Sequence, residues 1–384
     1  MDKINRLILL CLRAENDKTV IPEINQIIRD KYVGWSRLAS EASRHRVIPL
    51  VVKALGDLMP ASNKEFLAAQ DDLKKTLQAN TVRNLFLVSE LEKVQKVLGS
   101  YGIKTLAFKG PVLAQLAYDD VSMRQFDDLD LLVARSCIIR AMKMLMAEGY
   151  EPKIDLPDAA RRMHIREDWG CALHSPAEEY YIELDSSIVP RNYVFDLNLN
   201  DLHERAVSVE IDGKIFKSLS VEDQIHLLCV HGGKHLWERW LWLTDLDGLV
   251  RNNPEADWPL IIKRAENTGT IRLLVLGMFL AEKYVGTGIP SEISKRVEKD
   301  SVLNELAEYV VPYMEGTASS FDGWKKTMPF ILKARERAGD RAKYFCRFLF
   351  RPSYSDWKTF RLPQSLSFFY YLLRPFRILS RIFK

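Results

Sequence analysis

Two short apolar runs with a helix-sized segment between them constrain the fold of this 384-residue chain more than any other feature. The first run, residues 103–108, ends at Lys109-Gly110, and the second, residues 129–134, begins inside the acidic sequence Asp127-Asp128-Leu129-Asp130. Each run has the length of a buried strand, whereas residues 110–117 suit a short helix. The segment therefore predicts a strand–helix–strand unit with polar residues at its strand ends.

The acids at the second strand suggest a cation site. Asp128 and Asp130 are two residues apart, so both side chains point to the same side of a strand. Adjacent carboxylates raise one another's pKa unless a cation lies between them. Mg²⁺ prefers oxygen ligands and, held in this way, bridges protein acids to nucleotide phosphates. The pattern predicts a Mg²⁺–nucleotide site, and the alternative is a strand-end turn or a helix cap.

Other residues complete such a site. Lys109-Gly110 precedes a helix whose free N–H groups can receive an anion, and lysine adds a point charge for a phosphate. Arg124 is predicted to add a second phosphate contact. The strand "YYIELDSSI" offers a third acid. Glu183 is preferred because it lies deeper in the apolar run, and Asp185 remains an alternative.

The pattern divides the chain into four regions. Residues 1–100 are predicted to be a helical region with a long helix over 63–99, and residues 101–219 form an α/β core. Hairpins are expected near 170–185 and around Asp212-Gly213. Residues 220–340 are predicted to be helical, and residues 341–384 form a basic, aromatic-rich tail. We therefore expect an α+β fold with a small mixed sheet between helical regions.

Several segments, in order over residues 30–280, together resemble a known family: "LAFKGPVLAQLAY", "MRQFDDLDLLV", "YIELD" and "LSVEDQIHLLCVHGGKHLWERWLWLTDLDGLV". They are similar to a poorly characterised bacterial nucleotidyltransferase family within the DNA polymerase β-like superfamily. The resemblance implies a mixed sheet of nucleotidyltransferase type that binds Mg²⁺ and takes an NTP as its substrate. It also implies that Asp128, Asp130 and Glu183 are metal ligands and catalytic residues, with Gly110 in the phosphate loop.

This sequence departs from the family pattern in three places. The superfamily usually has Gly-Ser or Gly-Gly where this chain has Lys109-Gly110, and the gap to the acidic pair is longer here. Asp185 stands where the narrower family often has a histidine. The intact acids favour an enzyme that transfers a nucleotidyl group to an unidentified acceptor. The altered phosphate loop favours a non-catalytic nucleotide-sensing or partner-binding module.

A later helix carries two histidines. His231 and His235 are four residues apart and share a helix face with Lys234 beside them. Gly232 occupies the place of the catalytic glutamate in a zinc-protease helix, so that function is excluded. The histidines and Lys234 either contact substrate or phosphate, or pack the helix on the sheet. Three tryptophans that follow are predicted to pack mainly in the protein: Trp237, Trp240 and Trp242.

The charge distribution points to a surface partner. Residues 341–384 contain ten lysines and arginines and one acid, Asp356, a balance of +9. The net charge is +4, so the first 340 residues sum to −5. Near the end, one set of residues is apolar and another basic: Phe376, Leu379 and Phe383 against Arg377, Arg381 and Lys384. This pattern is typical of an interfacial helix on an anionic bilayer. The alternative is a helix docked on the body with its basic face in water.

The cysteine content indicates the cellular compartment. The five cysteines are scattered and form no paired motif, which favours a reducing compartment. We therefore expect a cytoplasmic protein, peripheral to the inner face of the membrane if the tail binds lipid. No recognised motif accompanies the basic tail, so specific nucleic-acid binding is not expected.

Overall fold

The computed structural model describes residues 2–29, 34–56, 64–154, 165, 170–175, 180–318, 324–359, 362 and 366–382. Three of the features predicted from the sequence lie partly or wholly outside these residues. They are the loop of the hairpin near 170–185, at residues 176–179, the first residue of the long helix, residue 63, and the terminal Phe383 and Lys384.

Within the described residues, seven strands form one mixed sheet in the order β3-β4-β5-β2-β1-β7-β6. The central strand β2 (Asp128–Val133) is antiparallel to β1 (Thr105–Ala107) and parallel to β5 (Tyr181–Asp185). The other strands are β3 (Glu151–Pro152), β4 (Gly170–His174), β6 (Val207–Ile211) and β7 (Lys214–Ser218). Both predicted hairpins are confirmed, and Asp212 and Gly213 adopt the left-handed conformation that a two-residue hairpin turn requires.

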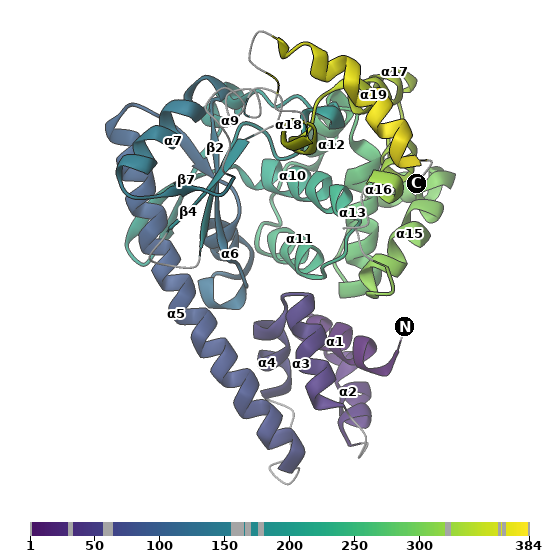
Figure 1. Ribbon diagram of the computed structural model, residues 1–384. Coiled ribbons are helices and arrows are strands. Elements are labelled where there is room, and N and C mark those ends of the chain that lie inside the picture. The colour runs from purple at the N-terminus through teal and green to yellow at the C-terminus, as the bar shows by residue number, and fades with distance from the viewer. Residues whose placement is uncertain are drawn as a thin grey trace.

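Helices cover both faces of the sheet (Figure 1). The long helix α5 (Lys64–Ser100) and α7 (Ile138–Ala147) pack on one face, against the alternate β2 residues Leu129, Leu131 and Val133. Helices α10 (Val221–Lys234) and α11 (Leu241–Asn252) lie on the other side, where Leu132 joins their core. Because side chains alternate along a strand, Asp128 and Asp130 point toward α10 and α11.

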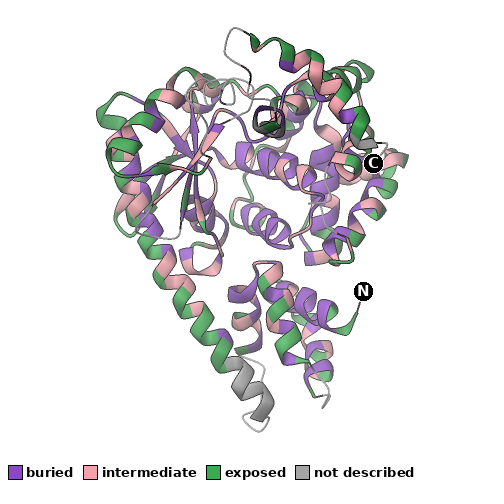
Figure 2. Cartoon of the chain, in the orientation of Figure 1, coloured by how far each residue is buried: buried purple, intermediate pink, exposed green. Residues whose placement is uncertain are grey.

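The N-terminal and C-terminal helices share one apolar core, which Figure 2 shows as a largely buried interior. The N-terminal group consists of α1 (Lys3–Arg13), α2 (Ile21–Ile28), α3 (Trp35–Arg44) and α4 (Ile48–Gly56). Beyond the sheet and α11 come α12 (Trp258–Asn267), α13 (Ile271–Val285), α14 (Ser291–Lys299), α15 (Ser301–Met314) and α16 (Trp324–Ala334). Two short helices complete the core region, α6 (Gly110–Tyr118) and α9 (Leu199–Glu204). The fold class is confirmed, while the boundaries of the four regions stay a prediction.

The turn between α10 and α11 is set by tight packing around Trp237. A Cβ atom at Gly232 or at Gly277 would lie 2.6 or 2.9 Å from the Trp237 ring. The two glycines therefore leave the space in which the tryptophan folds back against α10 and α13. Trp237 and Trp240 are fully buried, as the sequence predicts, and the position of the turn between the helices follows from this packing.

The C-terminal segment contains α17 (Ala338–Phe350), α18 (Tyr354–Thr359) and α19 (Phe369–Ile382). α19 docks on α17 and α18 through Tyr370 and Ile378, which are buried. Arg377 lies 2.6 Å from the buried carboxylate of Asp356, so it faces the body and not the solvent. The expected solvated basic face is wrong for this arginine, because the buried acid requires a cation. Of the helices in the described parts of the chain, none combines the length and hydrophobicity needed to cross a membrane.

Candidate functional site

Three carboxylates from two neighbouring strands meet on the side of the sheet that faces α10. The parallel register aligns Asp130 of β2 with Glu183 of β5, and Asp185 follows two residues later on the same side. One oxygen of each carboxylate lies within 4.8 Å of the others. We call Asp130, Glu183 and Asp185 the acidic cluster. Both candidates for the third acid are therefore present together, and Asp128 lies beside the cluster.

The acidic cluster opens into a cavity of about 260 Å³ between the sheet and the α10–α11 turn. Nine of the ten site residues predicted from the sequence line it, all except Gly110: Lys109, Arg124, Asp128, Asp130, Glu183, Asp185, His231, Lys234 and His235. Segments more than 100 residues apart in the chain thus converge on one cavity. Whether these residues bind nucleotide or metal stays a prediction.

The acidic cluster holds more like charge than its surroundings neutralise. Burial raises the pKa of Asp130 to about 7, with Lys109 opposing the shift and the nearby Asp128 and Glu183 adding to it. Burial, followed by the charges of Glu183 and Asp130, also raises the pKa of Asp185 well above its usual range. A hard divalent cation would relieve this repulsion, and carboxylate oxygens are the ligands it prefers. The cluster therefore fits a Mg²⁺ ion.

Lys109 immediately precedes α6 and Gly110 is its first residue, directly beside the acids. Lys109 Nζ donates a hydrogen bond of 2.7 Å to Asp130 Oδ1, and the acids raise the pKa of Lys109 against the effect of burial. Gly110 has a φ of 53°, and a Cβ there would lie 3.3 Å from the Asp128 carbonyl oxygen. Glycine is thus required by backbone conformation. In this structure the ammonium group of Lys109 binds Asp130. Its contact with a phosphate stays a prediction.

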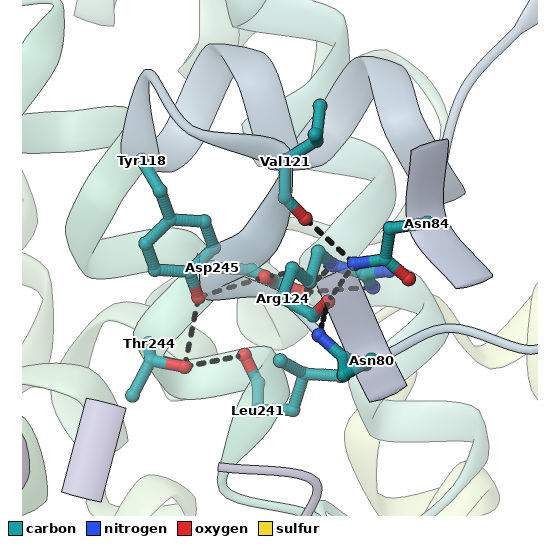
Figure 3. A network of polar contacts seen from close by, with 8 residues as sticks. All are labelled: Asn80, Asn84, Tyr118, Val121, Arg124, Leu241, Thr244 and Asp245. Atoms are coloured by element: carbon teal, nitrogen blue, oxygen red, sulfur yellow. Dashed lines mark hydrogen bonds and ion pairs between the residues drawn. The ribbon is translucent and has the colours of Figure 1, made fainter. Parts of the chain in front are cut away.

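Arg124, four residues before β2, belongs to a polar network that joins three helices (Figure 3). Its Nε and Nη2 atoms bind the Asp245 carboxylate of α11 at 3.0 Å, and both residues are buried. Asn80 and Asn84 of α5 donate hydrogen bonds to the Arg124 carbonyl oxygen. Tyr118 of α6 donates to Asp245. The guanidinium reaches the cavity, but its main partner is Asp245 and its evident role is to hold β2 in place.

The two histidines approach the cavity from the end of α10. Their ring centroids are 4.7 Å apart, and both rings pack against Trp242. Burial, followed by neighbouring cations, lowers the pKa of His231 and of His235 well below the usual value. Both are therefore neutral at physiological pH. They line the cavity and pack at the same time, so the two interpretations of the sequence are not exclusive.

Several site residues were missed by reasoning from the sequence. Gly170 of β4 lies opposite Asp185, and a Cβ there would be 2.1 Å from the Asp185 carboxylate oxygen. A glycine within a strand signals such a close approach, so this residue could have been found. Arg46, Glu238 and Arg239 also line the cavity. They come from turns between helices and belong to no local motif.

The sheet, the adjacent-strand acids and the glycine-initiated helix define an α+β protein with an acidic cavity beside its sheet. The chain belongs to the family described as uncharacterised nucleotidyltransferase, which matches residues 31–286, two thirds of its length. The match includes the acidic cluster, Arg46 and the α10–α11 turn and excludes the basic tail.

Two further comparisons add little to this family assignment. No curated protein matches the chain. Among solved structures, it is similar to an antigenic nucleotidyltransferase-like protein from Paracoccidioides brasiliensis. The two are 13% identical, and the match covers 57% of this chain and 91% of that chain with a TM-score of 0.31.

Proposed function

We propose that this protein transfers a nucleotidyl group from an NTP to an acceptor in a Mg²⁺-dependent reaction, as a member of the DNA polymerase β-like superfamily. The observation that carries the proposal is the acidic cluster, whose three carboxylates share one face of two parallel strands inside a cavity. A hydroxyl or phosphate oxygen of the acceptor forms a bond to the α-phosphorus, the bond from the α-phosphorus to the bridging oxygen breaks, and pyrophosphate leaves. The proton of a hydroxyl acceptor passes to Glu183 and from there to water.

The residues of the cavity would have different roles in this reaction. Asp130, Glu183 and Asp185 would hold the metal, with Asp128 beside them, and Glu183 would also help to activate the acceptor. Bound Mg²⁺ supplies electrostatic stabilisation of the charge on the phosphates. Gly110 allows the backbone at the start of α6 to approach an anion closely. His231, His235 and Lys234 would contact the substrate from α10.

One observation favours a second function, a non-catalytic nucleotide-sensing or partner-binding module. Lys109 binds Asp130 in a partly buried ion pair, so part of the charge of the acidic cluster is neutralised by the chain itself. A cation that bound Asp130 through Oδ1 would compete with this lysine. A binding module could retain the pair.

The two functions are separated by following the labelled phosphate. The wild-type protein is incubated with Mg²⁺, each α-phosphate-labelled NTP and a cell extract as the source of acceptors. We expect pyrophosphate release and transfer of label to an acceptor. Glu183→Gln should slow both by at least about 100-fold, the order of loss when one preorganised electrostatic group is removed. Nucleotide binding without pyrophosphate release would favour the module, and release of γ-phosphate alone would contradict both.

A further inference from the structure

Two arginines from distant turns line the same cavity as the acidic cluster. Arg46 lies between α3 and α4, and Arg239 lies between α10 and α11. Both side chains are half-buried. Arg46 pairs at 2.6 Å with Asp127, an exposed acid. Burial, followed by the charge of Arg46, lowers the pKa of Arg239, and the nearby acids oppose this shift. Such a pair of arginines is stabilised by an anion placed between its members.

The two turns are joined, so the arginines are held in place. The His45 ring stacks on Trp240 with a centroid distance of 3.5 Å and an interplanar angle of 2°. The backbone N–H of Trp240 donates to His45 Nδ1, and that of Leu241 donates to the His45 carbonyl oxygen. Arg46 itself has a φ of 57°, which ends α3 in the left-handed conformation and turns the chain sharply. The N-terminal helices thus position the Arg46 side chain at a cavity whose acids lie on the sheet.

We propose that Arg46 and Arg239 form a phosphate-binding pair for the β- and γ-phosphates of the NTP. The inference rests on the proposed function and adds a substrate-binding role for the N-terminal helical region. The cavity is lined by the acids of the strands and, on the two turns, by Arg46 and Arg239 together with one acid, Glu238. Acids that can hold a metal and arginines in the same cavity match a metal-bound triphosphate. Arginine suits this role because its planar guanidinium donates two parallel hydrogen bonds to phosphate oxygens.

The test measures binding of Mg²⁺–tripolyphosphate by calorimetry, without any nucleoside or turnover. Arg46→Gln and Arg239→Gln should each weaken binding about 10-fold, because a hydrogen bond to a charged group is lost. Arg83→Gln is the matched control, since Arg83 also contacts Asp127, the exposed acid that pairs with Arg46, but does not line the cavity. It should bind like the wild type.

The outcomes separate this inference from the reaction. Unchanged affinity in both arginine variants, or no binding by the wild type, would overturn the phosphate-binding pair. If the wild type binds tripolyphosphate through these arginines but releases no pyrophosphate from any NTP, the pair stands and nucleotidyl transfer fails. If transfer occurs at the wild-type rate and KM in both variants, the pair is wrong and the reaction stands.

A separate observation concerns α19, which turns its apolar side toward solvent. Phe369, Leu372, Phe376 and Leu379 are exposed and follow one another at spacings of three and four residues, so they form a stripe along one side. The opposite side binds the body through charges. Arg374 donates to Asp356 at 2.6 Å and to the Phe348 carbonyl oxygen, and Arg377 also pairs with Asp356. This arrangement is the reverse of an ordinary surface helix.

The segment that carries the apolar stripe, residues 341–384, is basic. The one acid among residues 341–384, Asp356, is buried and bound by two arginines. Lys343 and Arg341 of α17 are exposed, as are Phe345 and Phe350 of the same helix. A second copy of this chain would bring two basic surfaces together. An anionic bilayer offers apolar and negatively charged components at once.

We infer that the apolar stripe of α19 and the basic residues around it bind reversibly to an anionic membrane surface. Charge complementarity carries the choice of partner, and the inference is independent of the site. Because the stripe is exposed and its opposite side holds the helix in place, α19 can lie on the lipid without leaving the body.

The inference is tested by sedimentation with vesicles containing phosphatidylserine. The wild type should pellet at low salt and be released largely at 0.5 M NaCl, because salt screens the charges. Leu372→Glu with Phe376→Glu should abolish pelleting. Val82→Glu with Leu85→Glu is the matched control, with the same charge change at two exposed apolar residues of α5, and should pellet normally.

Three results would overturn the membrane inference. The wild type could stay in the supernatant, both double variants could pellet equally, or pelleting could be as strong with neutral phosphatidylcholine vesicles. If the wild type instead forms a dimer that Leu372→Glu with Phe376→Glu disrupts, the stripe binds a second copy. Thermal unfolding of both variants checks that exposed substitutions leave the fold unchanged.

Discussion

Asp185→Asn is expected to weaken Mg²⁺ binding by at least about 100-fold and, without divalent ions, to stabilise the fold. Loss of a residue that only hydrogen-bonds to a metal ligand and orients it lowers metal affinity about 10- to 100-fold. Loss of the metal ligand itself should therefore lower the affinity further. The stability gain follows from the crowding of the acidic cluster, where burial, Glu183 and Asp130 raise the pKa of Asp185. Function and stability therefore change in opposite directions.

The stability change has a definite dependence on pH. Since its pKa is raised in the folded protein, Asp185 keeps a proton that the unfolded chain releases above about pH 4. The cost of this carboxyl group to folding therefore grows from about pH 4 upward until its raised pKa is reached. In EDTA, the gain from Asp185→Asn should be larger at pH 7.5 than at pH 5. Saturating Mg²⁺ should stabilise the wild type and leave the variant unchanged.

Denaturant unfolding measures the free energy of unfolding of both proteins under four conditions: pH 5 and pH 7.5, each in EDTA and in saturating Mg²⁺. Asp127→Asn serves as the control, because Asp127 is an exposed acid next to β2 that pairs with Arg46 outside the acidic cluster. It should retain Mg²⁺ binding. A destabilised Asp185→Asn protein in EDTA, or one that binds Mg²⁺ normally, would remove Asp185 from the metal site.

Arg124→Met is expected to lower the free energy of unfolding by about 3–5 kcal/mol, the cost of leaving a buried charge without its partner. Asp245 is fully buried, and burial already raises its pKa against the effect of Arg124. The variant leaves that carboxylate with Tyr118 and no cation. The effect should appear in denaturant unfolding without any ligand, which a residue acting only on phosphate would not cause.

A second substitution provides the control for Arg124. Arg124→Met combined with Asp245→Leu removes both charges, and we expect most of the lost stability to return, because replacing a buried ion pair by apolar residues is often neutral or stabilising. Equal unfolding free energies for Arg124→Met and the wild type would refute the structural role. The predicted contact of Arg124 with a phosphate would then be its remaining role.

The local sequence determined the parts of this protein that depend on near neighbours. Lys109-Gly110 ends one buried strand and Asp128 begins another, and alternation along a strand puts Asp128 and Asp130 on one side whatever the rest of the chain does. The same rule places Glu183 and Asp185 together on β5. Helical spacing and the Asp212-Gly213 turn likewise need only a few residues, so the fold class and both acidic pairs could be predicted.

The tertiary structure alone decided which of these residues meet. The register between β2 and β5 brings Asp185 into the acidic cluster and leaves Asp128 at its side, and register depends on pairing between segments about fifty residues apart. The buried pairing of Arg124 with Asp245 could not be predicted from the sequence, because the two residues lie 121 positions apart. The stacking of His45 on Trp240, 195 residues further on, brings Arg46 to the cavity. Periodicity cannot reveal such contacts, since they arise from how helices pack on the sheet and on one another.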